Sequence, residues 1–315
     1  MDTALAPVSQ AQALAASAPT LGDYVEQWLA ELDASPTTKA GYRAGIRAYL
    51  RFLADHGLSG AHRGDIVAYK GHLQATYAPG TVSTRLTPVR GLYGYLHATT
   101  GAPDIATGIR GAKAQRGHRK DALTPSQVQA LLGAAQGNAR DYALVLLMVA
   151  TGLRTIEIAR AQVADLRAVA GKTVLDVWGK GRESKDALVI VTAPVEAAIR
   201  AYLKERGAVE DTAPLFPSVS NRSAGEAMTT RAISRLVKGY LVAAGLSSSR
   251  LTAHSLRHTA VTLSLLGGAS LQEAQTMARH ANITTTQVYA HNLERLQGHG
   301  EAAVTGFLQA EGIAL

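Results

Sequence analysis

A basic segment near the middle of the chain, residues 109–121, divides the sequence into two parts. It reads IRGAKAQRGHRKD and has little apolar content. Its cations are Arg110, Lys113, Arg116, Arg119 and Lys120. Such a segment is a poor candidate for burial, so it predicts a basic linker between two domains. With 315 residues, of which 47% are hydrophobic, the chain is long enough for each part to build its own core.

The part before the linker, residues 21–108, has helical patterns with one apolar and one cationic face. In residues 37–57 the apolar positions, which recur at helical spacing, are Tyr42, Ile46, Tyr49, Leu50 and Leu53. A second helical stretch covers residues 81–101. Pro88 lies inside it, and we expect this proline either to kink the helix or to start a new one capped by Thr87.

The charge is unevenly distributed along the chain. Lys and Arg total 32 against 24 Asp and Glu, a formal net charge of +8. Residues 36–100 are more biased, because the only acidic residues there are Asp55 and Asp65. The cations of residues 36–100 are Lys39, Arg43, Arg47, Arg51, Arg63, Lys70, Arg85 and Arg90. This balance favours a polyanionic partner.

Several function classes are excluded at this stage. The chain has no cysteine, so disulfides, thiolate nucleophiles and cysteine zinc sites are ruled out. The longest apolar run, residues 142–150, is far shorter than the ~20 residues that span a bilayer. Residues 1–20 lack the features of a signal peptide. We therefore expect a flexible tail there, on a cytoplasmic protein with no membrane contact.

The part after the linker, residues 122–291, is predicted to be mainly helical. Thr124, Pro125 and Gln127 form a helix-start signature with a capping box. Two β-branched runs, residues 173–178 and 187–191, flank a Gly-rich turn and predict a β-hairpin. Further helices are expected at residues 195–205, 229–244, 254–266 and 271–279. The fold class is therefore mainly α with a small β-hairpin or sheet.

Four polar signals lie in this mostly apolar part. Gly152 ends a buried helix, Arg154 follows it, and Thr155 is placed to cap the next helix, from which Glu157 reaches the guanidinium. The other signals are Lys180 on the hairpin turn, the pair His254 and Arg257, and the pair His280 and Tyr289. Each alone has a structural explanation, such as an ion pair at a helix junction or a solvated lysine.

Taken in order, these residues resemble the tyrosine recombinase (phage integrase) family, most closely its compact Xer-like and Cre-like members. The segments that carry the resemblance are TGLRTIEIARAQVADL, VWGKGRESKDALVIV and LTAHSLRHTAVTLSLLGGASLQEAQTMARHANITTTQVYAH. The resemblance implies an N-terminal helical core-binding (SAM-like) domain and a C-terminal catalytic domain. Two positions depart from the family pattern: Arg279 replaces the usual glycine before His280, and Pro88 interrupts a helix that approaches DNA.

The resemblance implies a site-specific DNA recombinase that works through a 3′-phosphotyrosine on Tyr289. A phenol with an ordinary pKa of ~10 needs a proton acceptor, and His254 is the candidate. Arg154 and Arg257 would stabilise charge on the phosphate, and His280 would donate a further hydrogen bond. Lys180 would protonate the leaving 5′-oxygen as general acid.

No metal or other cofactor is expected for this chemistry. His254 and His258 are spaced i, i+4, but no third ligand is near, so we interpret His258 as structural. No Walker-type loop is present, and the covalent ester makes ATP unnecessary.

The expected partner is double-stranded DNA with paired inverted half-sites, on the nucleoid. The side chains expected to contact it are Lys39, Arg43, Arg47, Arg85, Arg90, Lys113, Arg116 and Arg119. The resemblance further implies a homo-oligomer, expected to be a tetramer, together with accessory proteins that set direction. Residues 292–315, which end in a helical pattern with apolar Val304 and Phe307, are expected to dock on a neighbouring protomer.

Three rival functions fit the sequence less well. A type IB topoisomerase uses a similar Arg, Lys and Tyr set, but the His254-x-x-Arg257 box and the Xer-like N-terminal part argue against it. A regulator that has lost catalysis is disfavoured because all six expected catalytic positions are filled. An unrelated helical protein does not explain six ordered matches together with the basic N-terminal part.

Overall fold

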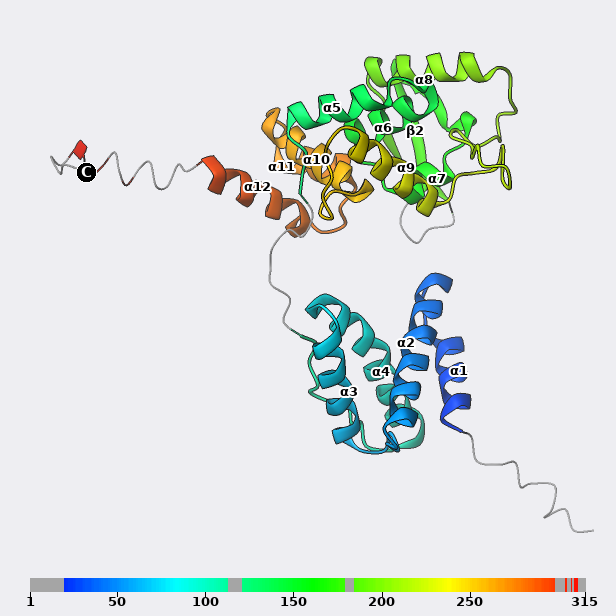
Figure 1. The fold of residues 1–315 in the computed structure, drawn as a ribbon, viewed down its shortest axis with the longest axis vertical. Coiled ribbons are helices and arrows are strands. Elements are labelled where there is room, and N and C mark those ends of the chain that lie inside the picture. The colour runs from blue at the N-terminus through cyan, green and yellow to red at the C-terminus, as the bar shows by residue number, and fades with distance from the viewer. Residues whose placement is uncertain are drawn as a thin grey trace, which may run out of the picture. The chain divides into compact units, whose positions relative to one another are not determined.

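The computed structural model describes residues 20–112, 121–178 and 184–297, together with residues 304, 307, 309 and 310. Contacts within the chain divide it into two compact units, Met1–Gly117 and His118–Leu315, and each is described by itself (Figure 1). The expected tail at residues 1–20, apart from Thr20, lies outside the described residues. So do the linker cations Lys113, Arg116 and Arg119.

The first unit consists of helices packed around an aromatic core. Its helices are α1 (Leu21–Glu31), α2 (Pro36–Asp55), α3 (Arg63–Thr76) and α4 (Pro79–Thr100). Thr20 and Ser35 cap α1 and α2, and a proline occupies the first position of α2 and of α4. Tyr49 and Tyr93 share a buried hydrogen bond of 3.1 Å between their hydroxyl groups. Burial accounts for most of the rise in the pKa of both phenols.

Helix α4 continues through Pro88 without a break, so the expected new helix start is wrong. Thr87 does not cap a helix, because its hydroxyl donates to the Ser83 carbonyl of the same helix at 2.9 Å. The Pro88 ring is buried and lies against Gly45 of α2, where a Cβ atom would come within 2.7 Å of Pro88 Cγ. A glycine on one helix therefore makes room for the proline ring of the other.

This contact predicts opposite effects for two glycines of α2. Gly45→Ala should lower the free energy of unfolding by about 1–3 kcal/mol, because its methyl group overlaps the Pro88 ring. Gly41→Ala is the matched control, since a Cβ there meets nothing within 4 Å. It should stabilise the helix by about 0.5–1 kcal/mol. Denaturant unfolding of the full chain, followed by Trp28 fluorescence in a Trp178→Phe background, measures both. Equal effects would contradict the packing argument.

The packed part of the first unit extends into the segment expected to be a linker. Ile109 is buried in the core of this unit. Ser83 of α4 donates its hydroxyl to the Ala112 carbonyl at 3.1 Å, and Gly111 passes close to the same serine. Residues 109–112, which were expected to belong to the linker, therefore pack on the first unit, because the buried Ile109 and the Ala112 carbonyl tie them to it.

The second unit combines a small antiparallel sheet with surrounding helices. Its sheet contains β1 (Leu166–Val169), β2 (Lys172–Trp178) and β3 (Lys185–Ile190), in the order β1-β2-β3. The hairpin of β2 and β3 agrees with the sequence expectation, and Leu175 pairs with Val189. Strand β1 was not predicted from the sequence. It is short, and the helical turn η2 (Val163–Asp165) leads into it.

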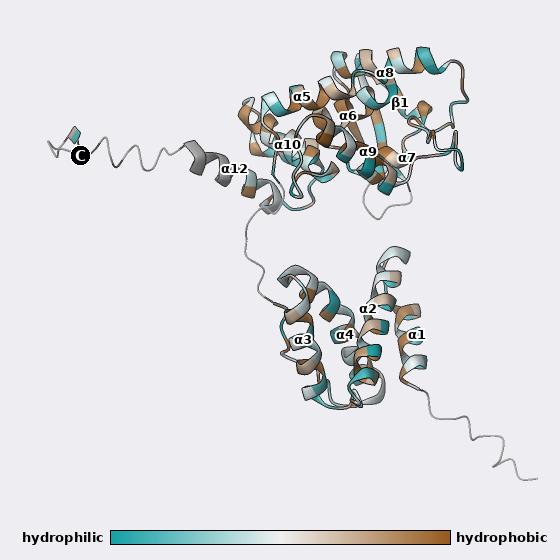
Figure 2. Ribbon diagram, viewed as in Figure 1, coloured by the Kyte–Doolittle hydropathy of each residue, from teal (hydrophilic) through white to brown (hydrophobic). Residues whose placement is uncertain are grey.

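The helices of this unit enclose one large hydrophobic core and a smaller separate cluster of Val261, Ala278 and Tyr289. They are α5 (Pro125–Ala135), α6 (Ala139–Thr151), α7 (Thr155–Arg160), α8 (Ala193–Arg206), α9 (Thr230–Ala243), α10 (Ala253–Leu266), α11 (Leu271–Ala278) and α12 (Thr284–Gln297). The predicted capping box of Thr124 and Gln127 is present at α5. Helix α6 is hydrophobic along most of its length (Figure 2). It is central to the core, and its C-terminus leads to the polar residues singled out in the sequence.

The architecture confirms a mainly α protein with a small sheet. Helix α12 runs to Gln297, beyond the boundary expected at residue 291 between catalytic domain and tail. In the described part of the chain, no helix combines the length and apolar character needed to cross a membrane.

Candidate active site

Five of the six residues predicted to be catalytic line one open cavity of the second unit. Its volume is about 700 Å³. These five residues are Arg154, His254, Arg257, His280 and Tyr289. A smaller cavity of about 310 Å³ shares the first three of them. The sixth residue, Lys180, lies outside the described residues.

Arg154 is positioned by the junction between α6 and α7. Gly152 ends α6 in the left-handed conformation, with φ of 63°. Arg154 itself is the N-cap of α7, so the expectation that Thr155 caps this helix is wrong. As expected, Glu157 orients the guanidinium, because its Oε1 accepts from Arg154 Nη1 at 2.8 Å. The other carboxylate oxygen, Oε2, accepts the Arg154 backbone N–H at 2.7 Å.

Arg279 forms a second ion pair with the carboxylate of Glu157. Its Nη2 donates to Oε2 of Glu157 at 2.8 Å, and its Nη1 donates to the Met277 carbonyl at 2.7 Å. The residue ends α11 in the left-handed conformation, with φ of 54°, which favours glycine. The departure from the family pattern thus places a third guanidinium beside the cavity. Its ion pair with Glu157, which is almost fully buried, offsets part of the backbone strain.

Arg257 is buried on α10 and bridges two turns. Its Nη1 donates to the Gly152 carbonyl at 2.7 Å, and its Nη2 donates to the Ala278 carbonyl. Burial, followed by repulsion from Arg154 and Arg279, lowers the pKa of this guanidinium to about 10. Arg257 therefore stays charged at neutral pH.

His280 follows α11 and is held in a defined orientation. Its Nδ1 lies 2.9 Å from the Thr286 hydroxyl, and its carbonyl accepts from Gln275 Nε2 at 3.1 Å. Burial, and then the positive charges of Arg257 and Arg154, lower the pKa of this imidazole to about 4. His280 is therefore neutral at physiological pH. When Thr286 donates to Nδ1, the ring proton is on Nε2.

Tyr289 is carried by α12 and is only 6% exposed. Its ring stacks on His280 at a centroid distance of 6.4 Å and lies 5.3 Å from the His258 ring. The hydroxyl makes a hydrogen bond with Nδ1 of His258. Burial raises the pKa of the phenol to about 12, although Arg257 opposes this shift. Tyr289 is thus fully protonated in this state.

The two histidines of α10 differ in their surroundings. His254 is exposed, and its ring lies 4.7 Å from that of His258 in a perpendicular arrangement. His258, which the sequence led us to interpret as structural, makes a hydrogen bond with the Tyr289 hydroxyl. The i, i+4 spacing of the histidines was the available signal, but it gave no indication of the tyrosine. Among the described residues, no cluster of His, Asp or Glu side chains is suited to holding a metal ion.

The second lysine of the hairpin, Lys185, is held at the start of β3. Its ammonium forms an ion pair with Asp165 and donates to Gln162 Oε1 at 2.8 Å. It also lies 6.0 Å from the centroid of the Trp178 ring. Lys185 thus has a structural role at the base of the hairpin.

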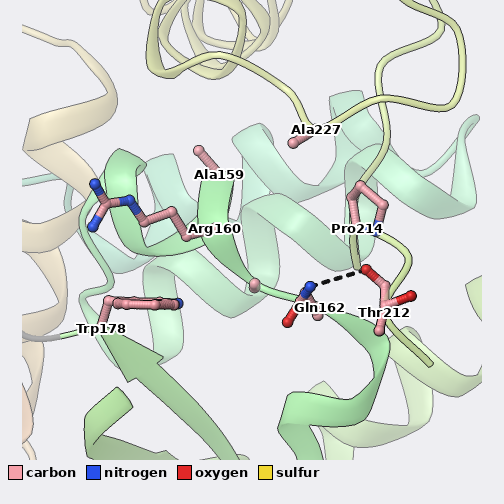
Figure 3. A pocket seen from close by; sticks show the side chains of 8 residues that line it. Ala159, Arg160, Gln162, Trp178, Thr212, Pro214 and Ala227 are labelled. Atoms are coloured by element: carbon pink, nitrogen blue, oxygen red, sulfur yellow. Dashed lines mark hydrogen bonds between the residues drawn. The ribbon is translucent and has the colours of Figure 1, made fainter. Parts of the chain in front are cut away.

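A separate cavity of about 480 Å³ lies beside this hairpin (Figure 3). Arg160 lies 5.7 Å from the centroid of the Trp178 ring, and Gln162 Nε2 donates to the Thr212 carbonyl at 3.0 Å. None of the five predicted catalytic residues that the structure describes lines this cavity.

The predicted nucleic-acid contacts of the first unit lie on α2 and α4. Arg47 and Arg90 are exposed. Arg43 forms an ion pair with Glu26 of α1, with an Nε to Oε1 distance of 3.0 Å, which the sequence pattern did not predict. Lys39 donates to the Ala30 carbonyl at 3.1 Å, and Arg85 lies 4.4 Å from the centroid of the Tyr77 ring.

Comparisons with known proteins place these observations in a family. The model of the phage integrase family matches residues 121–295, more than half of the chain. Over 284 residues the chain is 32% identical to tyrosine recombinase XerD of Caulobacter vibrioides, covering 85% of this chain and 90% of that protein. It is 29% identical over 291 residues to XerD of Xanthomonas axonopodis pv. citri, covering 87% of this chain and 93% of that protein.

Solved structures share the fold at lower identity. A dimer of lambda integrase bound to a COC′ core site matches with a TM-score of 0.69 and 20% identity, covering 85% of this chain and 93% of that one. XerH recombinase bound to palindromic difH substrate matches with a TM-score of 0.68 and 18% identity, covering 90% and 85%.

The arrangement of charges predicts how His280 titrates. Its imidazole should stay neutral down to a pKa of about 4, and Arg279→Gln should raise that pKa because it removes one of the nearby positive charges. Side-chain nitrogen NMR of the full chain across pH 3–8 measures the titration. Arg200→Gln, on α8, is the control that removes a charge elsewhere and should leave the titration unchanged. An ordinary histidine pKa near 6.5 in the unmodified protein would contradict the electrostatic argument.

Proposed function

This chain belongs to the phage integrase family and is a site-specific tyrosine recombinase, and we propose that Tyr289 is the nucleophile with which it cuts DNA. The observation that carries this assignment is the position of Tyr289. It lines a cavity that is also lined by two arginines, Arg154 and Arg257, and by a neutral His280. Attack on a DNA phosphate would give a 3′-phosphotyrosine and a free 5′-hydroxyl.

The proposed phosphate site uses the guanidiniums and His280 as donors. The non-bridging oxygens of the phosphate gain negative charge as the phenol attacks. Planar, permanently charged guanidinium groups are suited to bind two of these oxygens. Glu157 holds Arg154 in place, and main-chain carbonyls hold Arg257, so neither side chain must be ordered during the reaction. His280, with its proton on Nε2, would donate a further hydrogen bond to the phosphate.

We assign protonation of the leaving 5′-oxygen to Lys180. The position of Lys185 supports this choice, because its ammonium is engaged by Asp165 and Gln162 at the base of the hairpin. In the sequence, Lys180 follows the last residue of β2 by two positions. An ammonium at this point would supply a proton to an alkoxide that otherwise leaves poorly.

The proposed substrate is double-stranded DNA with paired inverted half-sites, bound by a homotetramer. The lambda integrase structures include a dimer on a core site and a tetramer on a Holliday junction, which supports this assembly. Lys39, Arg47, Arg85 and Arg90 of α2 and α4, with the linker cations, would contact phosphates. Arg43 would have to leave Glu26 to join them.

Two further elements complete the proposed assembly. The exposed Val304 and Phe307 of the C-terminal tail would dock on a neighbouring protomer. Accessory proteins would set the direction of recombination. A protein acting on chromosomal DNA in this way would work on the nucleoid, in the cytoplasm.

Removal of one oxygen atom tests the nucleophile. Tyr289→Phe should bind DNA normally and form no covalent adduct, because the ring still packs between His258 and His280. The substrate is the DNA that flanks the gene of this protein, and denaturing gels detect the adduct. Tyr142→Phe on α6 is the matched control and should still form it. An adduct in Tyr289→Phe would identify a different nucleophile.

The general acid is tested with a sulfur leaving group. Lys180→Ala should slow cleavage of ordinary DNA by roughly 10²–10⁴-fold. A substrate with sulfur at the scissile 5′-position should restore the rate, because a thiolate leaves without a proton. Arg154→Ala should remain slow on that substrate, since phosphate charge is still unstabilised.

Lys185→Ala provides the comparison within the hairpin. It should not be rescued by sulfur, because Lys185 is proposed to hold the strand rather than to donate a proton. Sulfur rescue of Lys185→Ala, with Lys180→Ala remaining slow, would move the acid to Lys185.

A further inference from the structure

His258 lies between the exposed His254 and the hydroxyl of Tyr289. The three rings form a continuous series, with centroid distances of 4.7 Å from His254 to His258 and 5.3 Å from His258 to Tyr289. The hydroxyl itself makes its hydrogen bond with His258 Nδ1. This contact joins the proposed nucleophile to an imidazole for which the sequence suggested no chemical role.

The surroundings make loss of the Tyr289 proton difficult without a nearby base. The side chain is 6% exposed, and its burial favours the neutral phenol. A water molecule is therefore poorly placed to take the proton. The titratable or charged groups that line the cavity with His258 are Arg154, His254, Arg257, Arg279, His280 and Tyr289. Of these, His280 is unsuited as a base, because surrounding cations oppose its protonation.

We propose that His258, rather than His254, takes the proton from Tyr289 when this tyrosine attacks DNA. The inference rests on the proposed function of Tyr289 as nucleophile. In the tautomer with its proton on Nε2, the His258 imidazole has a lone pair on Nδ1, to which the Tyr289 hydroxyl donates. A base must be within hydrogen-bond reach of the proton that it removes, and His258 meets this requirement before DNA is bound.

The proton and electrons balance through both halves of the reaction. During cleavage the O–H bond of Tyr289 breaks, its proton moves to His258 Nδ1, and the phenolic oxygen forms the new bond to phosphorus. The bond from phosphorus to the 5′-oxygen breaks with its electron pair on that oxygen, which takes a proton from Lys180. During rejoining, a 5′-hydroxyl attacks phosphorus and gives its proton back to Lys180. The bond from phosphorus to the phenolic oxygen breaks with its electron pair on that oxygen, which recovers its proton from His258.

The arrangement also gives His254 a different position in the site. Its exposed ring faces the cavities that contain Arg154 and Arg257, beside the proposed phosphate site. From there it supports His258 through the perpendicular ring contact. His254 is therefore assigned to the phosphate side of the site and His258 to the nucleophile.

The test makes the phenol at position 289 more acidic and measures which histidine variant then regains cleavage activity. His258→Gln and His254→Gln are prepared in the full chain, each with ordinary tyrosine or with 3,5-difluorotyrosine at position 289. The fluorinated phenol loses its proton more readily and needs less help from a base. Cleavage of a nicked substrate from the flanking DNA is followed as covalent adduct in single turnover. Gel-shift binding and thermal unfolding check that each variant is folded and binds DNA.

We expect His258→Gln to slow cleavage by roughly 10²–10⁴-fold with ordinary tyrosine. His258→Gln with difluorotyrosine at position 289 should cleave at least tenfold faster than His258→Gln with ordinary tyrosine. His254→Gln should gain no such advantage from the fluorinated residue. The cleavage rate of the unmodified enzyme should also rise with pH. The cleavage rate of His258→Gln should show no such rise.

Three results would overturn the inference. Cleavage by His258→Gln at the unmodified rate would remove any role for this residue. Fluorine rescue of His254→Gln alone would make His254 the base, and rescue of neither variant would reduce His258 to a packing role. All three leave the proposed function intact, because that function fails separately, through an adduct that persists in Tyr289→Phe.

Discussion

The hydrogen bonds of Arg257 hold the candidate active site together. Its guanidinium joins the carbonyl of Gly152, at the end of α6, to that of Ala278, at the end of α11. Hydrogen bonds from a charged donor contribute roughly 1.5–3 kcal/mol each, and a buried carbonyl without its donor costs a comparable amount. Since Arg154 follows the first turn and His280 the second, one side chain sets the distance between them. His258, the next residue on α10, makes a hydrogen bond with Tyr289.

The charges around this bridge explain why the cavity suits an anion. Arg154, Arg257 and Arg279 face a single acidic partner, Glu157, which is buried and bonded to two of them. Burial first, and then the surplus of positive charge, lowers the pKa of Arg257 and of His280. A phosphate diester entering the cavity would supply the missing negative charge. Its binding would then offset the repulsion among these guanidinium groups.

The sequence predicted features that depend on local chemistry. The Thr124 cap, the left-handed Gly152 and the hairpin each follow from neighbouring residues, and the structure contains them. Contacts between distant segments were beyond such reasoning. The ion pair of Arg43 joins residues 17 positions apart, and the hydrogen bond of His258 spans 31. The unbroken helix at Pro88 also required knowledge of the glycine that faces it from another helix.

The fit between Gly45 and Pro88 has a consequence for how the first unit meets a nucleic acid. Because the Pro88 ring of α4 packs directly against Gly45 of α2, the two helices have little freedom to slide past one another. Arg47 on one helix and Arg90 on the other are exposed, and their backbones are kept at a fixed separation. The phosphate contacts proposed for Arg47 and Arg90 would therefore keep a fixed spacing. Such a rigid pair of contacts would lose little conformational entropy on binding, and it would discriminate by the shape of the double helix rather than by its bases.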